Sequence, residues 1–73
     1  MSQILSPGTQ LDTAPSLEDR CDHCGAAAKL HVDLSGGGSL AFCGHHANQH
    51  TEEITRLAQR VVVEDGFHWR GRA

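Results

Sequence analysis

The sequence predicts a small α+β domain that is stabilised by a bound metal ion. Three observations lead to this class: the short chain of 73 residues, two closely spaced pairs of metal-ligating side chains, and a change of hydrophobic period after the second pair. Chains of this size bury little apolar surface, and natural small domains usually add disulfides or a metal. Only 38% of the residues are hydrophobic and three are aromatic, so this chain needs such a cross-link.

The cysteine content indicates a metal rather than disulfides. The chain has three cysteines, which cannot all pair with one another. Residues 1–15 lack the basic start and the apolar run of a secretory signal, and no apolar stretch approaches the ~20 residues of a membrane span. We therefore expect a cytoplasmic protein without membrane contact, and closely spaced cysteines in the cytosol are typical of metal sites.

The chain divides into an expected arm, domain and tail. Residues 1–16 are rich in Ser, Thr, Gln and Pro and have no periodicity, which predicts a disordered arm. Residues 17–65 contain the candidate ligands and the periodic segments, and these form the expected zinc-binding domain. Residues 66–73 are expected to form a flexible tail.

A β-hairpin is predicted between the two ligand pairs. Residues 29–34 alternate polar and apolar side chains, which is the pattern of a half-buried strand. Residues 40–42 form a short returning strand, and the glycine-rich residues 35–39 join the two strands. The hairpin would bring the two ligand pairs together.

The hydrophobic period becomes helical after Cys43, and we expect a helix from about His45 to Val61. Thr51 is a competing N-cap, in which case residues 45–50 form a separate turn. The three valines of residues 61–63 favour a strand locally but can also end the helix. The expected apolar stripe consists of Ala47, Ile54, Leu57, Ala58 and Val61.

The ligand pairs have the form Cys21-x2-Cys24 and Cys43-x2-His46. A two-residue spacer lets both side chains of a pair reach one ion, and tetrahedral Zn²⁺ takes sulfur and imidazole ligands. One pair alone would be a weak indication, but two pairs in a chain without another cross-link are specific. We therefore expect one structural Zn²⁺ rather than a redox cysteine pair, which usually lies on a larger βαβ framework.

Three histidines compete for the fourth position. On a helix, His46 lies about 60° around from Cys43, whereas His45 points nearly the opposite way. His50 shares the face of Cys43 but lies two turns further along the axis, so it would bind only if Cys43 precedes the helix. His46 is the preferred ligand, and His45 and His50 remain alternatives.

A catalytic role is not expected. His46 and His50 have the i, i+4 spacing of a metalloprotease helix, but position 47 is Ala rather than the required Glu. A site with three cysteine ligands and one histidine ligand also leaves no open position for water. Residues 36–38 are three glycines, but neither Lys-Ser/Thr nor a helix follows them, so they are not a phosphate loop.

Two segments of the chain resemble a known family. Arg20–Ala26 (RCDHCGA) and Leu40–Ala47 (LAFCGHHA) are similar to the motifs of short zinc-ribbon-like proteins of unknown function from actinobacteria and their phages. The resemblance covers about residues 20–57. It implies a cytoplasmic protein of a GC-rich host, and it implies no activity.

The order of a zinc knuckle, a β-hairpin and ligands at the start of a C-terminal α-helix looks like a treble-clef zinc finger. That layout places the second ligand pair in the first helical turn, which independently favours Cys43 and His46. A zinc ribbon with an added helix is the alternative fold.

A monomeric protein-interaction adaptor is the favoured function. The formal net charge is -3 and no catalytic group is recognised, so we expect a protein partner and no small-molecule substrate. In the tail, Phe67 and Trp69 lie beside Arg70 and Arg72, and aromatic and Arg residues are favoured interface anchors. Trp69 could equally cap the apolar back of the domain.

Nucleic-acid binding by a transcription-associated zinc finger is the alternative function. It rests on analogy with other zinc fingers and on Arg56 and Arg60, which would share a helix face. With Glu52 and Glu53 nearby, these arginines make a weak basic patch, whereas binding to phosphates requires clustered Lys and Arg.

Overall fold

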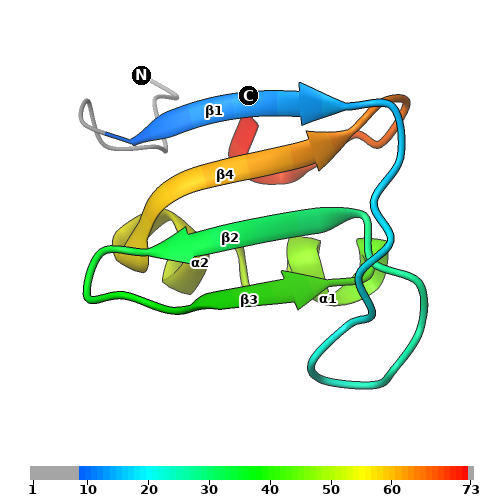
Figure 1. Cartoon of the computed structure of the whole chain (residues 1–73), viewed down its shortest axis with the longest axis horizontal. Coiled ribbons are helices and arrows are strands. Elements are labelled where there is room, and N and C mark those ends of the chain that lie inside the picture. Colours follow the sequence, from blue (N-terminus) through cyan, green and yellow to red (C-terminus); the bar gives the residue numbers. More distant parts are fainter. Residues whose placement is uncertain (1–8, 73) are drawn as a thin grey trace.

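The computed structural model describes residues 9–72, in which a four-stranded sheet carries the helices on one face (Figure 1). The strand order is β1-β4-β2-β3; β1 runs parallel to β4, and the other neighbouring strands are antiparallel. The domain is therefore α+β, as predicted. The strands are β1 (Gln10–Ala14), β2 (Leu30–Leu34), β3 (Ser39–Phe42) and β4 (Ala58–Glu64).

The helices are short. They are α1 (Gly44–Gln49) and α2 (Thr51–Leu57), and a 3-10 turn, η1 (Arg70–Arg72), ends the described chain. No helix within residues 9–72 is long and apolar enough to cross a membrane.

The predicted hairpin is confirmed as β2 and β3. Leu30 pairs with Phe42 and Val32 with Leu40, so these four side chains share one face of the sheet. The connecting turn contains Gly37 at φ 101° and Gly38 at φ 83°, a backbone region that glycine enters without steric cost.

The prediction of a single helix from about His45 to Val61 is wrong. α1 ends at Gln49, and the chain restarts as α2 at Thr51, whose hydroxyl donates to the carbonyl oxygens of Ala47 (3.1 Å) and Asn48 (2.9 Å). After Leu57 the chain enters β4, where residues 61–63 are all buried. A β-branched run suits a strand that has neighbours on both sides.

The arm expected to be disordered over residues 1–16 contains a strand. β1 pairs with β4, with Gln10 opposite Arg60 and Ala14 opposite Glu64. The partner strand is far away along the chain, so the local composition of the arm gave no sign of this pairing. Residues 1–8 of the expected arm lie outside the described residues.

The tail expected to be flexible over residues 66–73 packs against the domain through Trp69 and Gly71, both of which are buried. Trp69 is only 3% exposed, and its Nε1–H donates to the carbonyl oxygen of Ala47 at 2.9 Å. The backbone N–H of Arg70 donates to Oδ1 of Asn48 at 2.8 Å. Trp69 is therefore a cap over the core, and the idea that it is an exposed interface anchor is wrong.

One hydrophobic core lies between the sheet and the helices. The largest fully buried side chains are those of Leu30, Val32, Val61 and Val63, all from the two central strands. Cys21, Cys43 and Trp69 belong to the same cluster. Two of the four candidate metal ligands, Cys21 and Cys43, are therefore part of the core.

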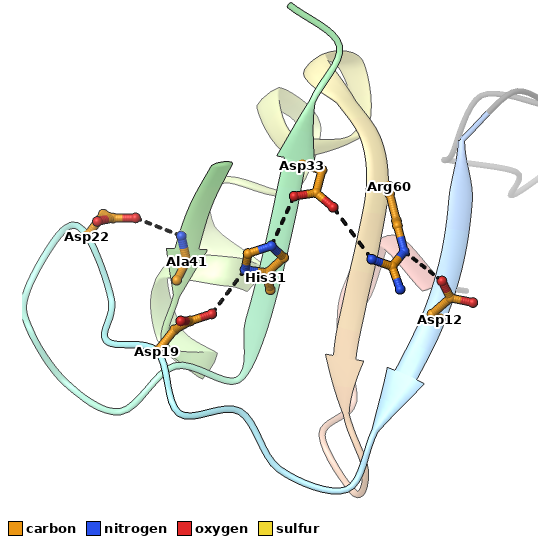
Figure 2. A network of polar contacts seen from close by, with 7 residues as sticks. All are labelled: Asp12, Asp19, Asp22, His31, Asp33, Ala41 and Arg60. Atoms are coloured by element: carbon orange, nitrogen blue, oxygen red, sulfur yellow. Dashed lines mark hydrogen bonds and ion pairs between the residues drawn. The ribbon is translucent and has the colours of Figure 1, made fainter. Parts of the chain in front are cut away.

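The opposite face of the sheet carries a chain of polar contacts (Figure 2). Arg60 on β4 donates to Oδ2 of Asp12 on β1 at 2.8 Å and lies 3.7 Å from Oδ2 of Asp33 on β2. His31 continues the chain, with Nε2 3.0 Å from Asp33 and Nδ1 3.0 Å from Asp19. The hydrogen bond from Arg60 lowers the pKa of the Asp12 carboxyl. These contacts connect three strands with the segment that leads to Cys21.

We expect Trp69→Ala to lower the free energy of unfolding by about 3–5 kcal/mol, because it removes a buried aromatic ring and the hydrogen bond from the indole N–H to the Ala47 carbonyl oxygen. Chemical denaturation followed by circular dichroism measures this change. Gly71→Ala should also destabilise the fold, since its Cβ would lie 2.6 Å from the Trp69 ring.

The exposed His68 supplies the control: His68→Ala should leave the stability unchanged. Equal stabilities of the Trp69→Ala and His68→Ala variants would contradict the packed tail.

Candidate metal centre

Cys21, Cys24, Cys43 and His46 meet at one point. Their ligand atoms, three Sγ atoms and one imidazole nitrogen, all lie within 4.8 Å of one another. These are the residues that the spacing of the sequence selects. They come from two places far apart in the chain, a turn before β2 and the junction between β3 and α1.

The first pair lies on a tight turn. The N–H of Gly25 donates to the Cys21 carbonyl oxygen at 2.8 Å, and the N–H of Cys21 donates to the Ala26 carbonyl oxygen at 2.7 Å. Gly25 has φ 81°, which the return of the turn requires and which other residues rarely adopt. The N–H of His23 also points at the Cys21 Sγ, at 3.4 Å. The turn therefore directs backbone donors towards a sulfur atom.

The second pair spans the start of α1. Cys43 is the N-cap residue of this helix, directly after β3, and its carbonyl oxygen accepts the N–H of Ala47 at 2.8 Å. His46 follows within the first helical turn, so its imidazole returns towards the Cys43 sulfur. The end of a strand and the start of a helix thus place both ligands without a special backbone conformation.

Asp22 fixes the first pair beside the second. Its N–H donates to the Ala41 carbonyl oxygen at 2.9 Å, and its Oδ2 accepts the N–H of Ala41 at 2.7 Å (Figure 2). Ala41 precedes Cys43 by two residues, on the edge strand β3. The Asp22 contacts therefore satisfy the outer hydrogen-bonding groups of Ala41 and position the turn for metal binding.

The ligand atoms are spaced as neighbours around a single ion. The Cys24 and Cys43 sulfurs are 3.8 Å apart, and Nδ1 of His46 lies 3.3 Å from the Cys43 sulfur and 3.6 Å from the Cys21 sulfur. Nδ1 is therefore the nitrogen that would bind the metal. Cys21 and Cys43 are buried, whereas Cys24 is exposed, so the group opens to solvent on one side.

The two alternative histidines lie outside this group. His45 is exposed, with its ring centroid 5.1 Å from that of His46. His50 directs Nδ1 at Oε1 of Glu53, 3.2 Å away, and its ring centroid lies 6.1 Å from that of His46. No other group of three or more ligating side chains occurs within residues 9–72.

The pKa values of the Cys21 and Cys24 thiols are shifted in opposite directions. Burial raises the pKa of the Cys21 thiol, but backbone N–H groups of Cys43, His23 and Cys24 outweigh this effect and bring it to about 7. The N–H of Ala26 lowers the pKa of the Cys24 thiol, whereas desolvation and the neighbouring sulfurs raise it, and the net shift is upwards. Crowded thiolates repel one another, and a cation between them removes this repulsion.

The surroundings of His46 favour the neutral form of its imidazole. Desolvation lowers the pKa of His46, and the surrounding histidines lower it further. The ring of His23, a residue that the spacing argument did not use, packs edge-on with its centroid 4.4 Å from that of His46. A lowered pKa favours the neutral ring, which is the form that binds a metal.

The fold and the site define a small α+β domain with a Cys3His group that could hold a metal ion. The chain belongs to a family described as a domain of unknown function, DUF7455, whose model matches residues 15–68. The match contains both ligand pairs, but it excludes β1 and η1. No curated protein and no solved structure gives a significant match.

We expect His46→Ala to weaken metal retention far more than His45→Ala, because only His46 directs a ring nitrogen at the sulfurs. Competition between the protein and a chromogenic chelator, with Zn²⁺ as the probe, measures retention for both variants. The two substitutions remove the same side chain from adjacent positions of α1, so each controls for the loss of a histidine. Equal retention would contradict the assignment of His46.

Proposed function

We propose that this protein is a structural zinc-binding module that acts as a small protein-interaction adaptor. The observation that carries the zinc assignment is the spacing of the four ligand atoms. Zn–S bonds of ~2.3 Å and Zn–N bonds of ~2.0–2.1 Å in a tetrahedron give edges of about 3.8 Å between sulfurs and about 3.6 Å between sulfur and nitrogen. Here the Cys24 and Cys43 sulfurs are 3.8 Å apart, and Nδ1 of His46 lies 3.3 Å and 3.6 Å from two of the sulfurs. All six distances among the four ligand atoms are within 4.8 Å.

The metal would have a structural role. Four protein ligands fill a tetrahedral shell, which leaves no position for a catalytic water. When bound, the ion would join the Cys21 turn to the start of α1. This arrangement follows the treble-clef order of knuckle, hairpin and helix, with β4 and β1 added to the hairpin, and we propose that the domain is a variant of that fold. We propose no enzymatic activity.

The adaptor role is supported by the surface of the domain. Leu40 and Leu57 are large hydrophobic side chains that are 36% and 50% exposed, and both border one apolar hollow. Exposed apolar surface that is grouped in one place is characteristic of interaction sites. The net charge of -3 favours a protein over a nucleic acid as partner.

The arrangement of the arginines gives nucleic-acid binding less support than the sequence suggested. Arg60 lies on β4 rather than on the helix face of Arg56, and its guanidinium contacts Asp12 and Asp33. The guanidinium of Arg70 contacts the carbonyl oxygen of Asn48. The arginines are thus dispersed, and acidic side chains already pair with one of them.

We propose that the protein acts as a cytoplasmic monomer in an actinobacterium or its phage, because its motifs resemble those of proteins from these sources. We therefore expect the zinc-loaded protein to retain a protein partner from an actinobacterial lysate. The bait is the tagged chain, and the lysate is treated with nuclease so that nucleic acid cannot bridge the two. Cys24→Ser, which removes one ligand, is the matched control. Retention of nucleic acid in untreated lysate with no protein retained after digestion would contradict the adaptor role.

A further inference from the structure

An apolar hollow lies between the β2–β3 hairpin and α2, with a volume of about 250 Å³. Val32, Phe42 and Ile54 are buried and form its base, whereas Leu40 and Leu57 are exposed at its edge. Leu40 and Leu57 are the two large hydrophobic side chains exposed within residues 9–72.

The hollow lies beside a short helix, α2. This helix spans seven residues and ends at Leu57, where the chain turns into β4. Trp69 and η1 pack near α1 and α2 and contribute no side chain to the hollow. The core face of the sheet is therefore left partly open where Leu40 projects from the edge strand β3.

Two histidines next to the candidate metal ligands line the hollow. His23, from the first ligand turn, and His50, between the two helices, both line it, and their ring centroids lie 5.3 Å apart. The ring of His23 also packs against that of His46. A metal that holds this turn against α1 would therefore also maintain the shape of the hollow.

The charge at the edge of the hollow is negative. Glu53 is the carboxylate that lines it, its side chain is 63% exposed, and the contact of Oε1 with Nδ1 of His50 at 3.2 Å holds it there. No Lys or Arg lines the hollow. A partner that places a positive charge beside an apolar group is therefore complementary to this surface.

The size of the hollow fits a side chain better than a whole small molecule. An apolar cavity of ~150 Å³ accepts a benzene ring, and binding sites for drug-sized ligands begin at ~300 Å³. One aromatic or branched aliphatic side chain would cover Leu40 and Leu57 and leave its own backbone outside.

We propose that this hollow docks a single large apolar side chain of a partner polypeptide, next to which a Lys or Arg pairs with Glu53. The inference rests on the proposed adaptor function and adds to it the docking surface and the chemistry of the partner. Selection of a random peptide library displayed on phage against the zinc-loaded protein tests it. The selected peptides should share an apolar anchor flanked by a basic residue.

Matched substitutions locate the binding. Leu57→Ser and Leu40→Ser should each weaken the selected peptides by about 10-fold or more, whereas Gln59→Ser, an exposed position outside the hollow, should not. Glu53→Lys should weaken binding, and a peptide with Glu in place of the basic residue should recover it. Glu52 is next to Glu53 in the sequence but does not line the hollow, so Glu52→Lys makes the same charge change and should have a smaller effect on binding. Since Leu40 and Leu57 are exposed, these variants should fold, which amide NMR spectra verify.

The outcomes separate the inference from the proposed function. Peptides that bind equally to the wild type and to both leucine variants would overturn the docking surface and leave the adaptor function standing. Failure to enrich any peptide would overturn the docking surface, whereas the adaptor function would be overturned by the lysate experiment described above. Self-association of the free protein that Leu57→Ser abolishes would make the hollow a contact between two copies of the chain, which also overturns the peptide partner.

Discussion

Three sulfur atoms and one imidazole nitrogen converge where the Cys21 turn meets the start of α1, and we propose that the rest of the domain depends on this convergence. The thiolates of such a group repel one another unless a cation lies between them. Cys21 and Cys43 are also part of the hydrophobic core, so the forces on the ligands act directly on the packing. A bound zinc ion would convert a repulsive group into the cross-link that this short chain needs.

The effects of this cross-link extend beyond the ligands. The carboxylate of Asp22 binds the N–H of Ala41 and so joins the Cys21 turn to β3. The Ala47 carbonyl oxygen of α1 accepts the indole N–H of Trp69 and so joins the tail to the helix. On the other face of the sheet, the contacts from Asp19 through His31 reach the central strands (Figure 2). The hollow next to α2 uses His23, which lies between the first two ligands. One centre thus connects the tail, the sheet and the proposed docking surface.

The local features of this molecule could be predicted from its sequence, and the distant ones could not. The hairpin follows from alternation over a few residues, and the Cys3His group follows from two short spacings. β1 has no comparable signal, because residues 10–14 form a strand only through pairing with β4. The valines of β4 fit both a helix end and a buried strand, and burial between two neighbouring strands decides between them. The Trp69 cap likewise depends on a carbonyl group of α1 that local patterns do not show.

We propose that folding and zinc binding are one equilibrium, because zinc would supply the cross-link that this short chain needs. The most direct test is a comparison of amide NMR spectra before and after a strong chelator is added under reducing conditions. Structural zinc in small domains contributes about 10–16 kcal/mol at neutral pH, which is comparable with the entire stability of a typical domain. We expect the chelator to abolish the dispersion of the amide signals of α1, α2 and all four strands together, and added zinc to restore it. Retained dispersion of the strand amides, including those of Val32 and Val61, would show that the core folds without the metal and would contradict this account.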